Sequence, residues 1–130
     1  MMRSPTPAPI LVVEDDAATS EFFVDLLREA GYDPHVAMSG EAALAALREH
    51  PVAAVVLDWR LPDMDGLAIC RQIRHAIDPV VPIILVTAQH SLALEAAVRD
   101  AGVTVYLPKP MPPAVLLRRL AELVLETWST

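Results

Sequence analysis

The sequence is poor in the residues that several protein classes require. Its 130 residues include one cysteine, Cys70, so an internal disulfide is impossible and a disulfide-stapled scaffold is excluded. Basic residues are also scarce: 10 Lys and Arg against 17 Asp and Glu give a net charge of −7, which argues against a nucleic-acid-binding domain. The longest apolar stretch, Val80–Val86, has seven residues and contains Pro82, whereas a bilayer-spanning helix needs ~20.

The N-terminus lacks the pattern of a secretory signal. Arg3 is followed by a proline-rich stretch that ends at Pro9, and the apolar run Ile10–Val13 leads directly into three acidic residues. A single cysteine is compatible with a reducing compartment. We therefore expect a cytoplasmic protein without membrane insertion, with a disordered tail over residues 1–8 and one domain over residues 9–127.

Short apolar runs separated by helix-like segments fill this domain. The five runs are Ile10–Val13, Val36–Met38, Ala53–Leu57, Ile83–Val86 and Val103–Leu107. None alternates cleanly between apolar and polar residues, which favours strands covered on both faces of a parallel sheet. Parallel strands need crossover connections, and five helical segments supply them. The sequence predicts an α/β fold: a doubly wound, five-stranded parallel sheet with five helices.

Capping residues and apolar spacing locate the helices. In the first helix, Asp16 is the expected N-cap, Gly31 follows the end, and an apolar stripe faces the core. That stripe consists of Phe22, Phe23, Leu26, Leu27 and Ala30. The third helix follows Asp65 and Gly66, and Cys70 is expected among its core residues. Ser91 is the expected cap of the fourth helix, and Pro112 and Pro113 open the fifth.

Polar groups follow four of the five predicted strands. Glu14 and Asp15 follow the first, Asp58 the third and Thr87 the fourth, while the fifth leads into Lys109. In open parallel sheets, ligands bind beyond the carboxyl ends of the strands. Two carboxylates ~4 Å apart repel by about 4 kcal/mol at an effective dielectric of 20, so such a cluster must raise a pKa or bind a cation. All-oxygen ligands suit Mg²⁺.

Lys109 is the only lysine among the ten basic residues. A chain that otherwise uses arginine has here a compact, point-like cation suited to phosphate. Thr87 has a competing explanation, because β-branched residues favour strands anyway. For Asp16, capping of the first helix is favoured over metal binding.

Four motifs resemble the receiver domain of two-component response regulators. They are Ile10–Asp16 (ILVVEDD), Val55–Gly66 (VVLDWRLPDMDG), Leu85–Ala88 (LVTA) and Tyr106–Pro110 (YLPKP). Their order and their places at strand ends make the resemblance specific, and it covers residues 9 to about 126. It implies a flavodoxin-like sheet with strand order 2-1-3-4-5, in which Asp15 and Asp58 meet at the switch point.

The resemblance implies a phosphoacceptor and a metal site. Asp58 would attack the phosphohistidine of a histidine kinase or histidine phosphotransfer protein and become an acyl phosphate. Glu14 and Asp15, with Asp58 and the backbone carbonyl of Arg60, would hold the cofactor Mg²⁺. The protein would be a switch that accelerates only its own phosphorylation and dephosphorylation, and no enzyme acting on an external substrate.

The resemblance also implies a response to phosphorylation. Lys109 would pair with the phosphoryl group, Thr87 would donate its hydroxyl to it, and Tyr106 would be the switch aromatic that turns inward. The Lys109–Pro110 bond is expected to be cis. Trp59 is bulkier than the usual occupant of its position, and its fluorescence is expected to report on Mg²⁺.

The same resemblance implies an output surface. The fourth helix, fifth strand and fifth helix would contact a downstream effector protein or domain, or form a phosphorylation-dependent homodimer. Arg99, Arg118 and Arg119 are candidate contacts there, although solvated helix charges are the favoured explanation of these three residues.

Two other functions compete with this interpretation. The pair Asp63 and Asp65 superficially suits an aspartate-nucleophile phosphohydrolase, but the pair follows Leu61-Pro62 and does not end a strand. A flavodoxin-like FMN-binding module is disfavoured because the first turn offers three acids where a phosphate needs hydroxyls and backbone N–H groups.

Overall fold

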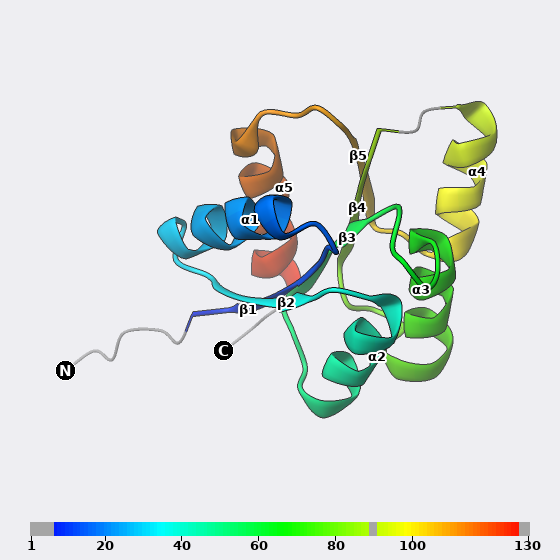
Figure 1. The fold of residues 1–130 in the computed structure, drawn as a ribbon, viewed down its shortest axis with the longest axis horizontal. Helices are drawn as coiled ribbons and strands as arrows, with labels where there is room; N and C mark the ends of the chain where they lie inside the picture. Colours follow the sequence, from blue (N-terminus) through cyan, green and yellow to red (C-terminus); the bar gives the residue numbers. More distant parts are fainter. Residues whose placement is uncertain (1–6, 89–90, 128–130) are drawn as a thin grey trace.

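A computed structural model of the chain describes residues 7–88 and 91–127 (Figure 1). The strands are β1 (Pro9–Val13), β2 (Asp33–Ala37), β3 (Ala54–Asp58), β4 (Ile83–Thr87) and β5 (Val105–Pro108). The α-helices are α1 (Ala17–Glu29), α2 (Gly40–Glu49), α3 (Gly66–Gln72), α4 (Leu92–Ala101) and α5 (Pro113–Thr127). A π-helix, η1 (Ile73–Ile77), continues α3.

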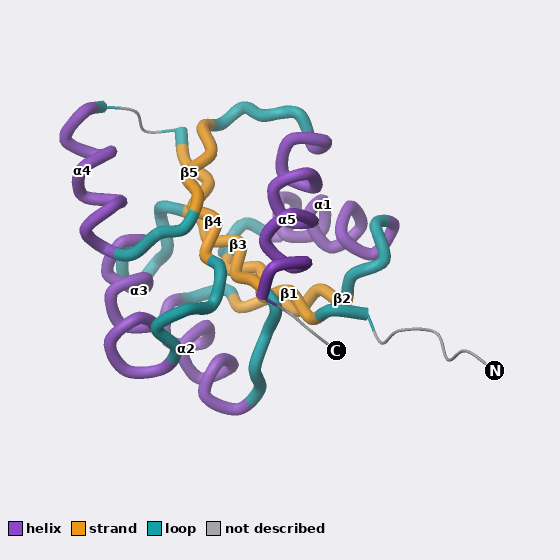
Figure 2. Tube along the Cα trace, turned by 180° about the vertical axis from the view of Figure 1, so that it is seen from behind, coloured by secondary structure: helices purple, strands orange, loops and turns teal. Residues whose placement is uncertain are grey.

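All five strands are parallel and run in the order β2-β1-β3-β4-β5, which confirms the predicted fold. Helices α1 and α5 cover one face of the sheet, and α2, α3 and α4 cover the other (Figures 1 and 2). The chain leaves β1 for β2 on one side and returns to β3 on the other, so the strand order reverses between β1 and β3. Ligands bind at such a switch point.

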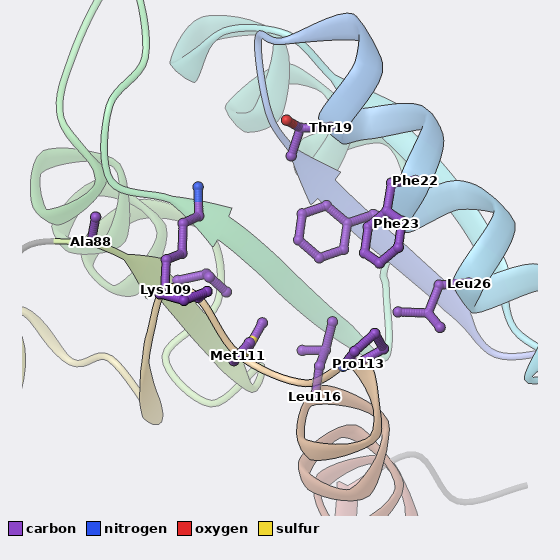
Figure 3. A pocket seen from close by; sticks show the side chains of 11 residues that line it. Thr19, Phe22, Phe23, Leu26, Ala88, Lys109, Met111, Pro113 and Leu116 are labelled. Carbon is purple, nitrogen blue, oxygen red and sulfur yellow. The ribbon is translucent and has the colours of Figure 1, made fainter.

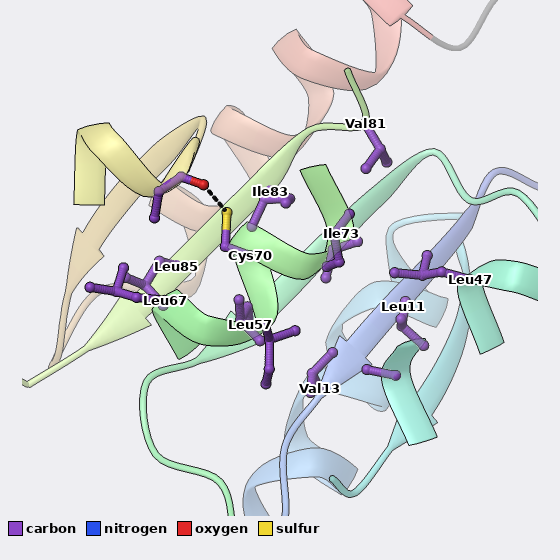
Figure 4. Packing of buried hydrophobic residues seen from close by; sticks show 14 of the residues in the cluster. Leu11, Val13, Leu47, Leu57, Leu67, Cys70, Ile73, Val81, Ile83 and Leu85 are labelled. Atoms are coloured by element: carbon purple, nitrogen blue, oxygen red, sulfur yellow. Dashed lines mark hydrogen bonds between the residues drawn. The ribbon is translucent and has the colours of Figure 1, made fainter. Parts of the chain in front are cut away.

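Successive residues of each central strand enter opposite layers of the core. Leu11 and Leu57 pack with α2 and α3, whereas Val12 and Val56 pack with the buried leucines of α1 and α5. Figure 4 shows the first layer, in which Cys70 is fully buried and its Sγ donates to the Ala101 carbonyl at 3.1 Å. Burial raises the pKa of the Cys70 thiol. The prediction that Cys70 is a core residue is confirmed.

The helix caps lie at the residues that the sequence predicts. Asp16 accepts from the Thr19 amide at 2.9 Å and Ser91 from the Leu94 amide at 3.0 Å, as predicted. Gly31 and Gly102 adopt positive φ angles of 93° and 90° just after α1 and α4. Across the described residues, no helix combines the length and apolar character that crossing a bilayer requires.

Several predicted details are wrong. β2 covers Asp33–Ala37 and not Val36–Met38, because an edge strand is covered incompletely: Val36 and Met38 are 41% and 52% exposed. In the stripe of α1, Phe22 is 51% exposed and Ala30 is exposed, so the buried face is narrower than predicted.

The predicted tail over residues 1–8 stays a prediction, because residues 1–6 lie outside the described part of the chain. Ala8, next to β1, contacts the sheet. Its carbonyl accepts from the Asp33 amide at 2.9 Å and its side chain packs against the core.

Candidate functional site

The carboxyl ends of the strands bring the predicted polar residues to one edge of the sheet. Glu14 follows β1 directly, Asp58 ends β3, Thr87 ends β4, and Lys109 follows β5. The backbone ties these ends together, since the Lys109 amide donates to the Thr87 carbonyl at 2.8 Å. Because parallel strands end at the same edge, residues up to 95 positions apart in sequence share one site.

Three carboxylates form an acidic cluster at this edge. One ligand oxygen each from Glu14, Asp15 and Asp58 lies within 4.8 Å of the others. Glu14 is only 3% exposed, whereas Asp15 is open to solvent. Burial raises the pKa of the Glu14 carboxyl to about 7; the Asp16 amide, donating to it at 3.1 Å, opposes this, and the Asp58 charge adds to it. Such a set of oxygen donors fits a hard divalent cation such as Mg²⁺.

Lys109 supplies the positive charge beside this cluster. Its Nζ lies 3.1 Å from Oδ1 of Asp58, with both side chains partly buried. The same oxygen accepts the Trp59 amide at 2.9 Å. The Lys109–Pro110 bond is cis, as predicted.

A cleft of about 330 Å³ opens over this ion pair. It is lined by Asp58, Trp59, Arg60, Thr87, Ala88 and Lys109. Thr87 is 1% exposed, and Trp59 is partly buried against the core. The cleft combines a carboxylate, an ammonium and a threonine, groups that can bind a phosphoryl group.

The loop after β3 approaches the site so closely that it requires a glycine. The Gly66 amide donates to the Trp59 carbonyl at 2.7 Å. A Cβ at Gly66 would lie 2.9 Å from the Asp58 carbonyl oxygen. Arg60 pairs with Asp65 in an isolated bridge within this loop, and the metal-binding role of its carbonyl stays a prediction.

Tyr106 lies outside the cleft. It is partly buried and lines a separate groove between α4 and β5 with Glu95, Val98, Arg99, Val103 and Thr104. Burial raises the pKa of the Tyr106 hydroxyl, with a smaller contribution from the Glu95 charge. Its predicted switching role is not tested by this arrangement. Of the predicted output residues, Arg99 lines the groove and Arg119 lies 3.6 Å from Glu122.

The remaining acids near the motifs have structural partners. Asp16 accepts the Thr19 amide and hydroxyl, which lower the pKa of Asp16. Asp65 accepts the Ala68 amide at 2.8 Å and caps α3. Asp63 accepts the Gly40 and Glu41 amides of α2, and among the described residues neither Asp63 nor Asp65 belongs to the acidic cluster, so nothing in this pair favours a hydrolase.

An apolar pocket of about 460 Å³ lies beside the cleft, between α1 and the loop before α5 (Figure 3). Phe22, Phe23 and Leu26 face Met111 and Leu116 across it, and Lys109 contributes its stem while Nζ points away from Met111. Sequence reasoning missed this pocket. Its one signal in the sequence was the width of the apolar stripe of α1, which leaves Phe22 51% exposed.

This chain is similar to known proteins in both sequence and fold. A sequence model described as the response regulator receiver domain matches residues 10–121. The response regulator MprA of Mycobacterium sp. (strain KMS) is 40% identical over 121 residues, which are 93% of this chain and 52% of that protein. The chain thus spans about half the length of the curated relatives it matches.

Solved structures agree with the sequence match. A CheY-like receiver domain protein from Methanospirillum hungatei JF-1 has a TM-score of 0.86 and 28% identity, with 92% of this chain and 95% of that one covered. The receiver domain of a sensor histidine kinase from Pseudomonas aeruginosa PAO1, solved with magnesium coordinated in its active-site cleft, has a TM-score of 0.82 and 31% identity, with coverages of 91% and 98%.

Proposed function

Because this chain belongs to the response regulator receiver family, whose members are phosphoacceptors in two-component signalling, we propose that Asp58 is the residue that receives the phosphoryl group. One observation carries this assignment: Nζ of Lys109 lies 3.1 Å from Asp58 Oδ1, beside the oxygens of Glu14 and Asp15. A carboxylate placed between a cation and a potential metal site is suited to attack phosphorus.

In the proposed reaction, an Asp58 oxygen attacks the phosphorus of a phosphohistidine as the P–N bond breaks on the opposite side. The electron pair of that bond returns to the donor imidazole, which takes up a proton. Oδ1 already accepts hydrogen bonds from the Trp59 amide and Lys109, so we expect Oδ2 to attack. Such a transfer needs in-line placement and charge neutralisation more than covalent help.

The acidic cluster would hold the cofactor. Glu14, Asp15, Asp58 and the Arg60 carbonyl are the proposed ligands of Mg²⁺. When bound, Mg²⁺ supplies the positive charge that lets three carboxylates and a dianionic phosphoryl group share one cleft. Lys109 would then bind a phosphoryl oxygen. Because its Nζ already lies 3.1 Å from Asp58 Oδ1, it would reach a phosphoryl group on Asp58 without a large movement.

Thr87 and Tyr106 would convert phosphorylation into a conformational change. Thr87 lines the cleft at the end of β4, and Tyr106 is partly buried two strand positions before the end of β5. The phosphoryl group would draw Thr87 inward, and Tyr106 would turn toward the space that Thr87 leaves. Such a switch biases a pre-existing two-state equilibrium toward the active state.

Receiver domains of this family work with histidine kinases and effector domains. For this chain, a histidine kinase or phosphotransfer protein is the proposed donor. A downstream effector or a phosphorylation-dependent homodimer would be the output, and neither nucleic acid nor membrane would be contacted directly. We also propose that the protein acts in the cytoplasm. The proposed receiver domain extends over residues 9–127.

The proposal is tested by incubating the chain with acetyl phosphate and Mg²⁺ and measuring intact mass. We expect a gain of one phosphoryl group that is lost in Asp58→Asn and in chelator. Asp25→Asn, which changes an exposed carboxylate of α1, is the matched control and should label normally. Labelling that persists in Asp58→Asn overturns the assignment. Continuous release of phosphate from phosphoesters would instead support a hydrolase, and copurified FMN a flavodoxin.

A further inference from the structure

The Asp63 carboxylate joins the loop after β3 to the start of α2. Oδ1 accepts the Gly40 amide at 2.8 Å and Oδ2 accepts the Glu41 amide at 2.9 Å, so both oxygens are engaged. First-turn amides of a helix have no acceptor within the helix. The two N–H groups lower the pKa of Asp63, which keeps the carboxylate ionised.

Tight packing accompanies these hydrogen bonds. Met64 lies against Gly40 so closely that a Cβ on Gly40 would approach its Cγ to 2.5 Å. Other interactions of this loop are local. The Gly66 amide donates to the Trp59 carbonyl, and Arg60 forms a β-bridge with Asp65. Asp65 in turn accepts an amide in the first turn of α3. The hydrogen bonds of Asp63 therefore fasten the loop to an element other than its neighbours β3 and α3.

The fastened segment carries groups of the functional site. Trp59 donates its amide to Asp58, and Arg60, three residues before Asp63, lines the cleft. Residues that hold a metal ligand in place commonly affect metal affinity by about 10- to 100-fold. A loop released from α2 would have to be ordered again when a cation binds, which weakens binding.

We propose that Asp63 is a positioning residue: by clamping the loop to the N-terminus of α2, it holds the Arg60 carbonyl in place for Mg²⁺ and the Trp59 amide in place for Asp58. This inference rests on the proposed function, because it assumes that Mg²⁺ binds at Asp58 and Arg60. Asp63 belongs to the VVLDWRLPDMDG motif but takes no part in the proposed reaction itself. The inference gives this residue a function.

The test is a Mg²⁺ titration of the full chain, without phosphodonor, followed by backbone amide NMR shifts. Asp63→Ala removes both hydrogen bonds and should weaken Mg²⁺ affinity about tenfold. Asp63→Asn removes the same charge but keeps one acceptor oxygen, so its affinity should fall between those of wild type and Asp63→Ala. Ser39→Ala is the matched control, since the Ser39 hydroxyl caps the same helix by accepting the Ala42 amide at 3.1 Å and is not an acceptor or donor in the Asp63 hydrogen bonds.

Each outcome has a distinct meaning. An unchanged affinity in Asp63→Ala overturns the positioning role, and equal losses in Asp63→Ala and Asp63→Asn show a purely electrostatic effect and overturn it as well. If Ser39→Ala weakens Mg²⁺ as much as Asp63→Ala, stability of α2 alone is responsible and the clamp is refuted. A wild-type chain without saturable Mg²⁺ shifts contradicts the proposed function, and the inference with it.

Discussion

Replacing Glu14 by glutamine should stabilise the metal-free protein, and increasingly so as the pH rises. Glu14 is almost fully buried, and its pKa rises from an ordinary 4.5 to about 7 on folding. The unfolded chain therefore releases this proton near pH 4.5, whereas the folded chain keeps it until about pH 7. The stability that wild type gains from holding this proton is fully present below about pH 4.5. It is lost as the pH rises through about 7, the pKa in the folded chain.

The size of the effect follows from the shift. At about 1.4 kcal/mol per pKa unit, the rise is worth on the order of 3 kcal/mol, most of which is lost between about pH 5 and pH 8. Glutamine has no such titration, and its Oε1 can still accept the Asp16 amide. Relative to wild type, Glu14→Gln should therefore gain roughly 2 to 3 kcal/mol of unfolding free energy over this range.

Urea unfolding in chelator across this pH range measures the difference. With a slope of about 2 kcal/mol per molar, the midpoint of Glu14→Gln should rise by about 1 M relative to wild type. Glu21→Gln, which changes an exposed carboxylate of α1, is the control and should show no such trend. Added Mg²⁺ should stabilise wild type more than Glu14→Gln, because a cation ligand is lost. A difference that does not change with pH refutes the burial argument.

Three further predictions address other parts of the molecule. In a Trp128→Phe background, Trp59 emission should change on addition of Mg²⁺; constant emission at saturation, established by NMR, would contradict its place beside the metal site. Arg74→Met should lower unfolding free energy by about 2 kcal/mol, because Arg74 donates to the Gly102 and Asp78 carbonyls and to Thr104, at 2.9, 3.3 and 3.2 Å. Exposed Arg71→Met is the control, and equal losses would show that these bonds do not stabilise the fold. Cys70 should react with a thiol reagent only after denaturation, and rapid labelling of the native protein would contradict its burial.

The central part of the fold was predictable because its signals are local. β1, β3 and β4 are covered on both faces, so their apolar runs mark them directly. β2 was misplaced because an edge strand needs fewer apolar residues, and its buried Pro34 and Ala37 carry little pattern. The π-helix after α3 was missed, since its wider turn leaves no distinct residue pattern.

The candidate site divides in the same way. Glu14, Asp58, Thr87 and Lys109 could be selected because each stands at the end of a predicted strand. Asp63 could not be understood, because the amides that bind it lie 22 and 23 residues earlier in the chain. The same holds for Arg74, whose acceptors at Gly102 and Thr104 lie 28 and 30 residues later.

The sequence by itself determined the order of strands and helices, the caps, and which chemical groups stand at the strand ends, because those features depend on neighbours within a few positions. Only the tertiary structure decided that Lys109 and Asp58, 51 residues apart, form an ion pair, and that Glu14 is buried enough to hold its proton near neutral pH. Distances and burial depend on how the sheet orders its strands and how the helices cover them, which is a property of the whole chain.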